Sequence, residues 1–164
     1  MAGIKRSLVQ ALFLLPYSLS LPYFSISLPL LPLMPKRILI IDNEQYIQEI
    51  AQICLETVAG WQVITAGSGQ AGLIQAEAHV PDAILLDVMM PDMDGLATFQ
   101  ALQANPKTCQ IPVILLTAKL QAADLNRYAE LGLQAAIAKP FNPLELAEQV
   151  ANALGWDWLD QGDG

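Results

Sequence analysis

The stretch Asp82-Ala-Ile-Leu-Leu-Asp87-Val-Met-Met-Pro-Asp-Met-Asp-Gly95 decides the fold. Its first part, Ala83–Leu86, is a short continuous apolar run, which is typical of a strand buried on both faces of a parallel sheet. An acidic side chain, Asp87, stands directly after that run. The residues from Gly95 to Asn105 have a helical pattern, so the stretch predicts a strand, a polar loop and a helix in succession.

The same alternation of strands and helices extends to both sides of this stretch. Short apolar runs predict four more strands, at residues 37–41, 61–65, 113–116 and 134–138. Apolar residues three and four apart, with capping residues before them, predict four more helices, at residues 47–59, 69–79, 119–130 and from 143 onward. Five strands alternating with five helices predict an α/β fold: a doubly wound, five-stranded parallel sheet with helices on both faces.

The first 35 residues differ from the rest of the chain. No charged residue occurs from Ser7 to Pro35, and Lys5 and Arg6 precede this stretch, as at the start of a signal peptide. About 20 apolar residues can cross a bilayer, but the prolines that recur here each remove a helical hydrogen bond. We therefore expect residues 1–35 to be a disordered or non-native extension, with Met34 as an alternative start.

The domain organisation follows from this difference. Residues 36–155 are expected to form the folded domain, and residues 156–164 a C-terminal tail that includes Trp158. A role at the membrane is expected only if the extension belongs to the native protein.

The charge and the cysteine content exclude several classes of protein. The 164 residues include 16 acidic and 8 basic side chains, a formal net charge of −8, which repels nucleic-acid phosphates. Cys54 and Cys109 lack metal-ligand spacing, and the single histidine, His79, cannot complete a zinc site with them. Cys54 lies on the apolar side of its predicted helix and is expected to be a core residue. Without a disulfide framework, a cytoplasmic location is expected.

Polar side chains suited to phosphate chemistry follow four of the predicted strands. They are Asp42, Asn43, Asp87, Thr117 and Lys139. The carboxyl ends of parallel strands form one crevice, so these side chains should lie together. Mg²⁺ prefers such oxygen ligands. A lysine and a hydroxyl suit a phosphoryl group beside the metal, and an aspartate there can be the nucleophile.

These residues, at these spacings, resemble the receiver domain of two-component response regulators, over about residues 36–155. The stretch Asp82–Gly95 is similar to the phosphoacceptor segment of that family, and Lys139-Pro140-Phe141 to its lysine motif, whose Lys–Pro bond is typically cis. The resemblance implies a flavodoxin-like strand order 2-1-3-4-5. It also implies a protein that accepts a phosphoryl group and is not a turnover enzyme.

The resemblance further implies a role for each site residue. Asp87 corresponds to the phosphorylated aspartate, Asp42 and Asn43 to the metal-binding acidic pair, and the backbone carbonyl of Met89 to a further metal ligand. Thr117 corresponds to the switch hydroxyl and Lys139 to the phosphate-contacting lysine. Mg²⁺ is the implied cofactor. A histidine kinase or a phosphotransfer protein is the implied donor, and an unknown protein is the downstream partner.

Two departures from the family leave alternatives open. Asn43 stands where the family usually has a metal-binding aspartate, and Ala136 stands where an aromatic switch residue is common. The chain is expected to be a stand-alone receiver, because few residues follow the fifth helix. The alternative is a degenerate receiver that binds proteins independently of phosphorylation. A phosphatase of the same architecture ranks last, because it needs an acid where Met89 stands.

Two other motifs are not expected to be functional. Gly67-Ser-Gly-Gln-Ala-Gly72 fits a dinucleotide-binding pattern, but it follows the second strand, and Gly72 falls inside the predicted helix. Asp92-Met-Asp94-Gly95 lacks the further ligands of a calcium loop.

Overall fold

The computed structural model describes residues 34–157. The expected leader, apart from Met34 and Pro35, and the tail from Trp158 onward lie outside the described residues. Within residues 34–157, none of the helices combines the length and the apolar character needed to cross a membrane.

Five parallel strands form one sheet in the order β2-β1-β3-β4-β5. The strands are β1 Arg37–Ile41, β2 Gln62–Ala66, β3 Ala83–Asp87, β4 Val113–Thr117 and β5 Ala135–Ala138. The helices are α1 Gln45–Ala59, α2 Gly69–His79, α3 Gly95–Ala104, α4 Ala122–Glu130 and α5 Leu146–Leu154. The predicted flavodoxin-like α/β fold is confirmed.

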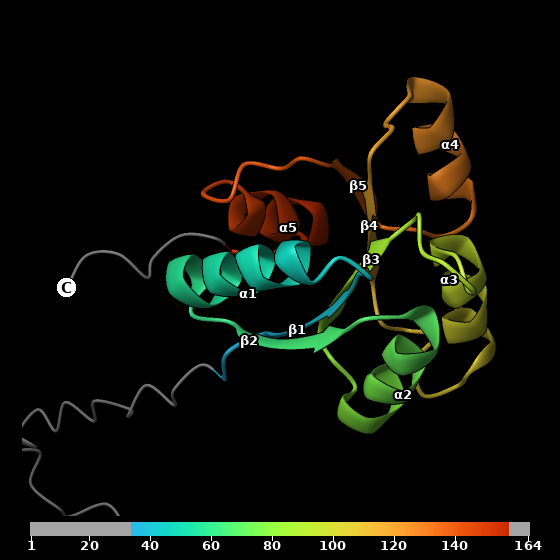
Figure 1. Cartoon of the computed structure of the whole chain (residues 1–164), viewed down its shortest axis with the longest axis horizontal. Coiled ribbons are helices and arrows are strands. Elements are labelled where there is room, and N and C mark those ends of the chain that lie inside the picture. The colour runs from blue at the N-terminus through green and yellow to red at the C-terminus, as the bar shows by residue number, and fades with distance from the viewer. Residues whose placement is uncertain (1–33, 158–164) are drawn as a thin grey trace, which may run out of the picture. The chain divides into compact units, whose positions relative to one another are not determined.

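Alternate residues of each central strand point into one of two apolar cores. Ile38 and Ile40 of β1 face α1 and α5, whereas Leu39 and Ile41 face the side of α2 and α3. Figure 1 shows α1 and α5 on one side of the sheet and α2, α3 and α4 on the other. Because both faces are covered, these strands are continuously apolar, and their polar residues are confined to the strand ends.

Two predicted helix starts were too early by about one turn. Helix α4 begins at Ala122, not at Lys119, because the Thr117 hydroxyl donates to the Lys119 carbonyl (2.9 Å) and accepts from its N–H (3.2 Å). Helix α5 begins at Leu146. In the turn before it, the Asn142 side chain accepts from the Leu144 N–H (3.1 Å), as the side chain of a helix-capping residue does.

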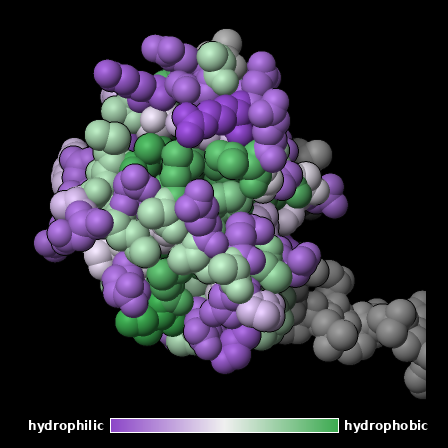
Figure 2. Space-filling model, turned by 90° about the vertical axis from the view of Figure 1, so that its right-hand side faces the viewer, coloured by the Kyte–Doolittle hydropathy of each residue, from purple (hydrophilic) through white to green (hydrophobic). Residues whose placement is uncertain are grey.

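Among the side chains of α4 that the structure describes, Tyr128 is the buried one. It belongs to the core cluster on the α2 and α3 side. Leu120 and Leu125 are 39% and 41% exposed, and Ala123 is exposed as well. Figure 2 shows this side of the molecule as a mixture of polar and apolar side chains, with an apolar area in its upper half.

Two glycines, Gly95 in α3 and Gly72 in α2, allow their helices to pack closely against the sheet. A Cβ at Gly95 would overlap the Asp87 carbonyl oxygen, and one at Gly72 would overlap the Ile41 side chain. Gly95 therefore lets the first turn of α3 lie directly against the end of β3. Gly72 lies inside α2, as expected, so the glycine-rich stretch serves helix packing and not a phosphate loop.

Candidate functional site

The carboxyl ends of the strands bring four of the predicted site residues together. Asp42 follows β1, Asp87 ends β3, Thr117 ends β4 and Lys139 follows β5. Asp42, Asp87 and Thr117 are 0%, 2% and 3% exposed. Since acidic side chains are rarely buried without a partner, the pocket must hold a compensating positive charge.

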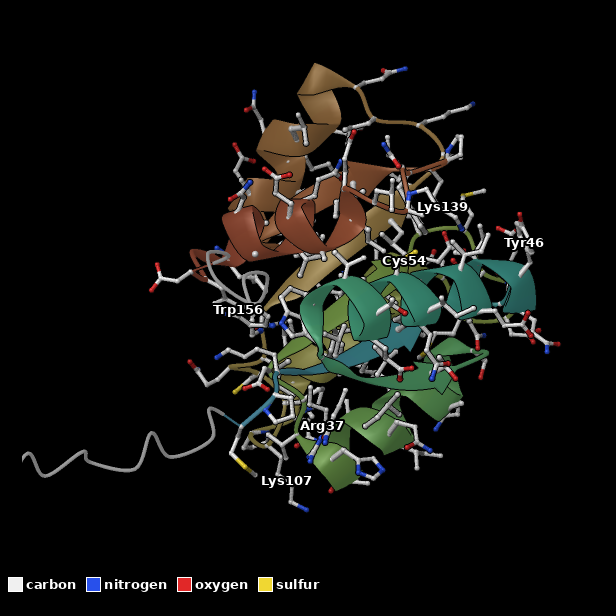
Figure 3. All side chains as sticks on the ribbon, turned by 90° about the vertical axis from the view of Figure 1, so that its left-hand side faces the viewer. Arg37, Tyr46, Cys54, Lys107, Lys139 and Trp156 are labelled. Carbon is white, nitrogen blue, oxygen red and sulfur yellow. The ribbon has the colours of Figure 1, made fainter. Side chains whose placement is uncertain are left out.

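Lys139 supplies that positive charge. Its Nζ atom lies 2.8 Å from Asp42 Oδ2, 3.0 Å from Glu44 Oε1 and 3.3 Å from Asp87 Oδ1. The Lys139 N–H also donates to the Thr117 carbonyl (2.8 Å), which holds the start of the β5–α5 loop against the end of β4. The Lys139–Pro140 bond is cis, as the resemblance implied. Figure 3 shows Lys139 toward the same end of the molecule as Tyr46, and Trp156 toward the other end.

The environment shifts the pKa values of two of these groups. Burial, and then the charge of Asp42, raise the pKa of Asp87, although Lys139 acts in the opposite direction. Burial disfavours the Lys139 ammonium, but its bonds to Asp42 and Glu44 and the charge of Asp87 outweigh burial and raise the pKa of Lys139. The pocket therefore keeps the lysine charged, while the negative charge in excess of that one ammonium remains costly to bury.

Glu44 is the pocket residue whose role the sequence did not predict. One carboxylate oxygen from each of Asp42, Glu44 and Asp87 lies within 4.8 Å of the others. Glu44 is the N-cap residue of α1, and its side chain makes no capping bond. Its position two residues after Asp42, just past a strand end, was the available signal, but an acid at the start of a helix is also typical of an exposed dipole partner.

Asn43, which the sequence predicts to be a metal ligand, follows Asp42 at the end of β1. It is exposed, and within residues 34–157 its side chain forms no hydrogen bond. The Asp42 carboxylate next to it is engaged on both oxygens, one with the Glu44 N–H (2.8 Å) and one with Lys139.

The donor set of the pocket fits Mg²⁺. Three carboxylates lie together, and no sulfur or imidazole belongs to their cluster within the described part of the chain. Mg²⁺ binds through one or two carboxylates and keeps several waters, which such a partly open acidic pocket allows. The Met89 side chain is 75% exposed, so the predicted role for its backbone carbonyl places no demand on the side chain.

The other chemistry-bearing residues lie apart from this pocket. Cys54 of α1, predicted to be a core residue, is a free thiol that is only partly buried and belongs to neither core cluster of the described residues. Burial raises the pKa of its thiol. Cys109 is also a free thiol, in the loop after α3. No cysteine or histidine belongs to the acidic cluster found within residues 34–157.

The comparisons with known proteins agree with this geometry. The profile of the family described as "Response regulator receiver domain" matches residues 38–151. The "Alkaline phosphatase synthesis transcriptional regulatory protein PhoP" of Bacillus subtilis is 38% identical over 121 residues, which are 74% of this chain and 49% of PhoP. The chain spans about half the length of the curated relatives it matches.

Solved structures match over nearly their whole length. The chemotaxis response regulator CheY4 of Vibrio cholerae is 26% identical with a TM-score of 0.68, and the match covers 73% of this chain and 98% of CheY4. A response regulator receiver domain protein from Methanospirillum hungatei is 29% identical with a TM-score of 0.64, covering 74% of this chain and 94% of that protein. By its sequence, its strand order and its acidic pocket, this chain belongs to the response regulator receiver domain family.

Proposed function

We propose that Asp87 accepts a phosphoryl group from a phosphohistidine of a histidine kinase or a phosphotransfer protein, and that the phosphorylated domain changes its affinity for a protein partner. Receiver domains are phosphoacceptors and not turnover enzymes, and they generally take the phosphoryl group from histidine kinases. The single observation that carries the proposal is the position of Asp87: buried at the end of β3, 3.3 Å from the Lys139 ammonium and clustered with two further carboxylates.

The transfer is a substitution at phosphorus. An Asp87 carboxylate oxygen forms a bond to phosphorus as the bond from phosphorus to the histidine nitrogen breaks, and that nitrogen leaves with the electron pair. Lys139 neutralises charge on the phosphoryl oxygens, and Mg²⁺ supplies further positive charge when bound. Asp42 is proposed to hold the metal, together with Asp87 and the Met89 carbonyl.

The response is proposed to start at Thr117. Its hydroxyl is bonded to Lys119, at the beginning of the loop that leads to α4. A phosphoryl group on Asp87 offers this hydroxyl a charged acceptor, which forms a stronger bond than a neutral carbonyl does. If Thr117 turns toward it, the loop after β4 loses its anchor and α4 is free to shift.

The proposal is tested by phosphorylating the full chain with acetyl phosphate and MgCl₂ and locating the added mass by peptide mass spectrometry. Asp87→Asn should take up no phosphoryl group. Asp92→Asn is the matched control, because Asp92 is an exposed acid of the same loop with a positive φ (65°) that asparagine tolerates. Labelling of Asp87→Asn at the wild-type rate would exclude Asp87 as the acceptor.

The phosphorylation-independent module remains the second candidate, because Asn43 removes a carboxylate from the predicted metal pair. Amide NMR spectra recorded with MgCl₂ and beryllofluoride, a phosphoryl mimic, separate the two functions. Shifts around Asp87, Thr117 and Lys139 support the acceptor. Unchanged spectra support the module.

A further inference from the structure

The side chain of Asn43 is poorly suited to hold a divalent cation in this pocket. It is neutral, it is exposed, and it forms no hydrogen bond to any group of residues 34–157. The buried Asp42 and Asp87 side chains supply two negative charges, and Lys139 already offsets part of them. A further carboxylate would strengthen the binding of a dication here, because it adds opposing charge that a neutral amide oxygen does not provide.

Glu44 has the charge, the reach and the freedom to provide it. Its side chain is 59% exposed, yet it turns back over the pocket and places Oε1 3.0 Å from Lys139 Nζ. No capping bond holds it at the start of α1. The ammonium of Lys139 is thus the group that orients Glu44 in the metal-free pocket.

Lys139 marks the position of a cation within this cluster. Its nitrogen lies 2.8–3.3 Å from three carboxylates on three different segments. Mg²⁺ holds its oxygen ligands at about 2.1 Å, so the oxygens that surround the ammonium must move inward to surround the metal. The two cations compete for the same oxygens, and the metal must displace the ammonium from some of them.

We propose that Glu44 supplies a third carboxylate for Mg²⁺, that Asn43 supplies no ligand, and that Lys139 leaves Glu44 when the metal binds. The inference rests on the proposed function only in taking Mg²⁺ as the cation. It assigns the metal site to Asp42, Glu44 and Asp87, with Asn43 as a bystander.

The test is a titration of the full-length, ¹⁵N-labelled chain with MgCl₂ alone, followed by amide NMR. Glu44→Gln should weaken Mg²⁺ binding about tenfold or more, and Asn43→Ala should change it less than about twofold. Glu49→Gln is the matched control, since Glu49 is an exposed acid of the same helix bonded only to Gln45 within residues 34–157. It should bind Mg²⁺ like the wild type. Equal Mg²⁺ affinity in Glu44→Gln and wild type would overturn the proposal, as would a tenfold loss in Asn43→Ala.

A double-variant cycle separates metal binding from the positioning of the lysine. In a Lys139→Met background, Glu44→Gln should still weaken Mg²⁺ binding about tenfold. If the loss disappears in that background, Glu44 acts only through Lys139 and the proposal is wrong.

Acetyl phosphate labelling of the same preparations distinguishes this inference from the proposed function. Glu44→Gln should recover wild-type labelling of Asp87 when MgCl₂ is raised to saturate its weaker site. An unlabelled wild-type Asp87 would contradict the proposed function, while the Mg²⁺ affinities would still decide the role of Glu44.

Discussion

At the residue scale, the pocket buries two carboxylates, Asp42 and Asp87, whose negative charges lower the stability of the fold. Asp42 and Asp87 are buried side by side and share one ammonium. Burying carboxylates is expensive unless they are paired and hydrogen-bonded. A fold that retains this arrangement is ready to bind a dication or a phosphoryl group with its magnesium, because either reduces the repulsion between the acids.

The cost at Asp87 predicts a pH-dependent gain in stability for Asp87→Asn. The pKa of Asp87 is raised above its ordinary value of 3.8, so the folded state disfavours the ionised form. The free energy of unfolding of the wild type therefore falls as pH rises through this titration. In EDTA at pH 7, Asp87→Asn should be more stable than the wild type, and the difference should vanish below about pH 3.8.

Urea unfolding across this pH range measures the difference between the two proteins, with Asp92→Asn as the control. A variant less stable than the wild type at pH 7 would show that the Lys139 pairing outweighs burial at Asp87.

Asn43→Asp is predicted to tighten Mg²⁺ binding about tenfold, equivalent to about 1.4 kcal/mol. Unit charges about 4 Å apart interact by about 4 kcal/mol at an effective dielectric of about 20, but repulsion from Asp42 and Asp87 offsets much of this. NMR titration is the suitable measurement. Trp61 fluorescence is a poor reporter of Mg²⁺ binding. Trp61 precedes β2 and packs against Trp156 (5.3 Å between ring centroids), at the end of the molecule away from Lys139. Equal or weaker affinity would argue against an added carboxylate at this position aiding the metal.

At the element scale, α4 depends on Tyr128 for its attachment. Tyr128→Ala should lower the free energy of unfolding by about 3 kcal/mol, the usual cost of truncating a buried aromatic ring. It should also speed amide hydrogen exchange throughout α4. Leu125→Ala, at a 41% exposed position of the same helix, should cost less than about 1 kcal/mol. Similar losses in the two variants would mean that α4 is held by more than this ring.

The end of α2 contains a strained residue. Val80 caps the helix with a φ of 42°, in the left-handed region that costs a residue with a Cβ about 1–2 kcal/mol. Its side chain is 55% exposed, so little packing would be lost on removing it. Val80→Gly should raise the free energy of unfolding by about 0.5–1 kcal/mol after the entropy cost of glycine is subtracted. Val80→Ala keeps the Cβ and is the control; thermal melts showing the same stability for both variants would contradict the strain.

At the scale of the whole molecule, the proposed response runs from the pocket to α4, which lies on the same side of the sheet as α2 and α3. Thr117 connects the pocket through Lys119 to the loop before α4, and Ala136 offers no ring on β5 to relay a change. With beryllofluoride and MgCl₂, amide shifts should therefore extend from the pocket through residues 117–121 into α4. They should be small around Trp156, at the opposite end of the molecule. Large shifts along β5, without any in α4, would contradict this route.

By itself, the sequence determined the order and type of all ten elements and the residues at the strand ends. Apolar runs such as Val113–Leu116 and helical spacing are local patterns, and the carboxyl ends of parallel strands must share one edge. Asp42, Asp87, Thr117 and Lys139 could therefore be grouped before any coordinates were known.

Long-range packing, in contrast, sets which of the side chains after β1 lie beside Lys139. Asn43 and Glu44 are neighbours in sequence, and the path of the chain into α1 leaves Asn43 exposed and brings Glu44 to Lys139. Likewise, sequence spacing could not tell buried Tyr128 from exposed Leu125 on α4, because burial depends on how the helix lies against β5. Side-chain direction at a helix start and the rotation of a helix on a sheet are set by long-range packing, which no local pattern contains.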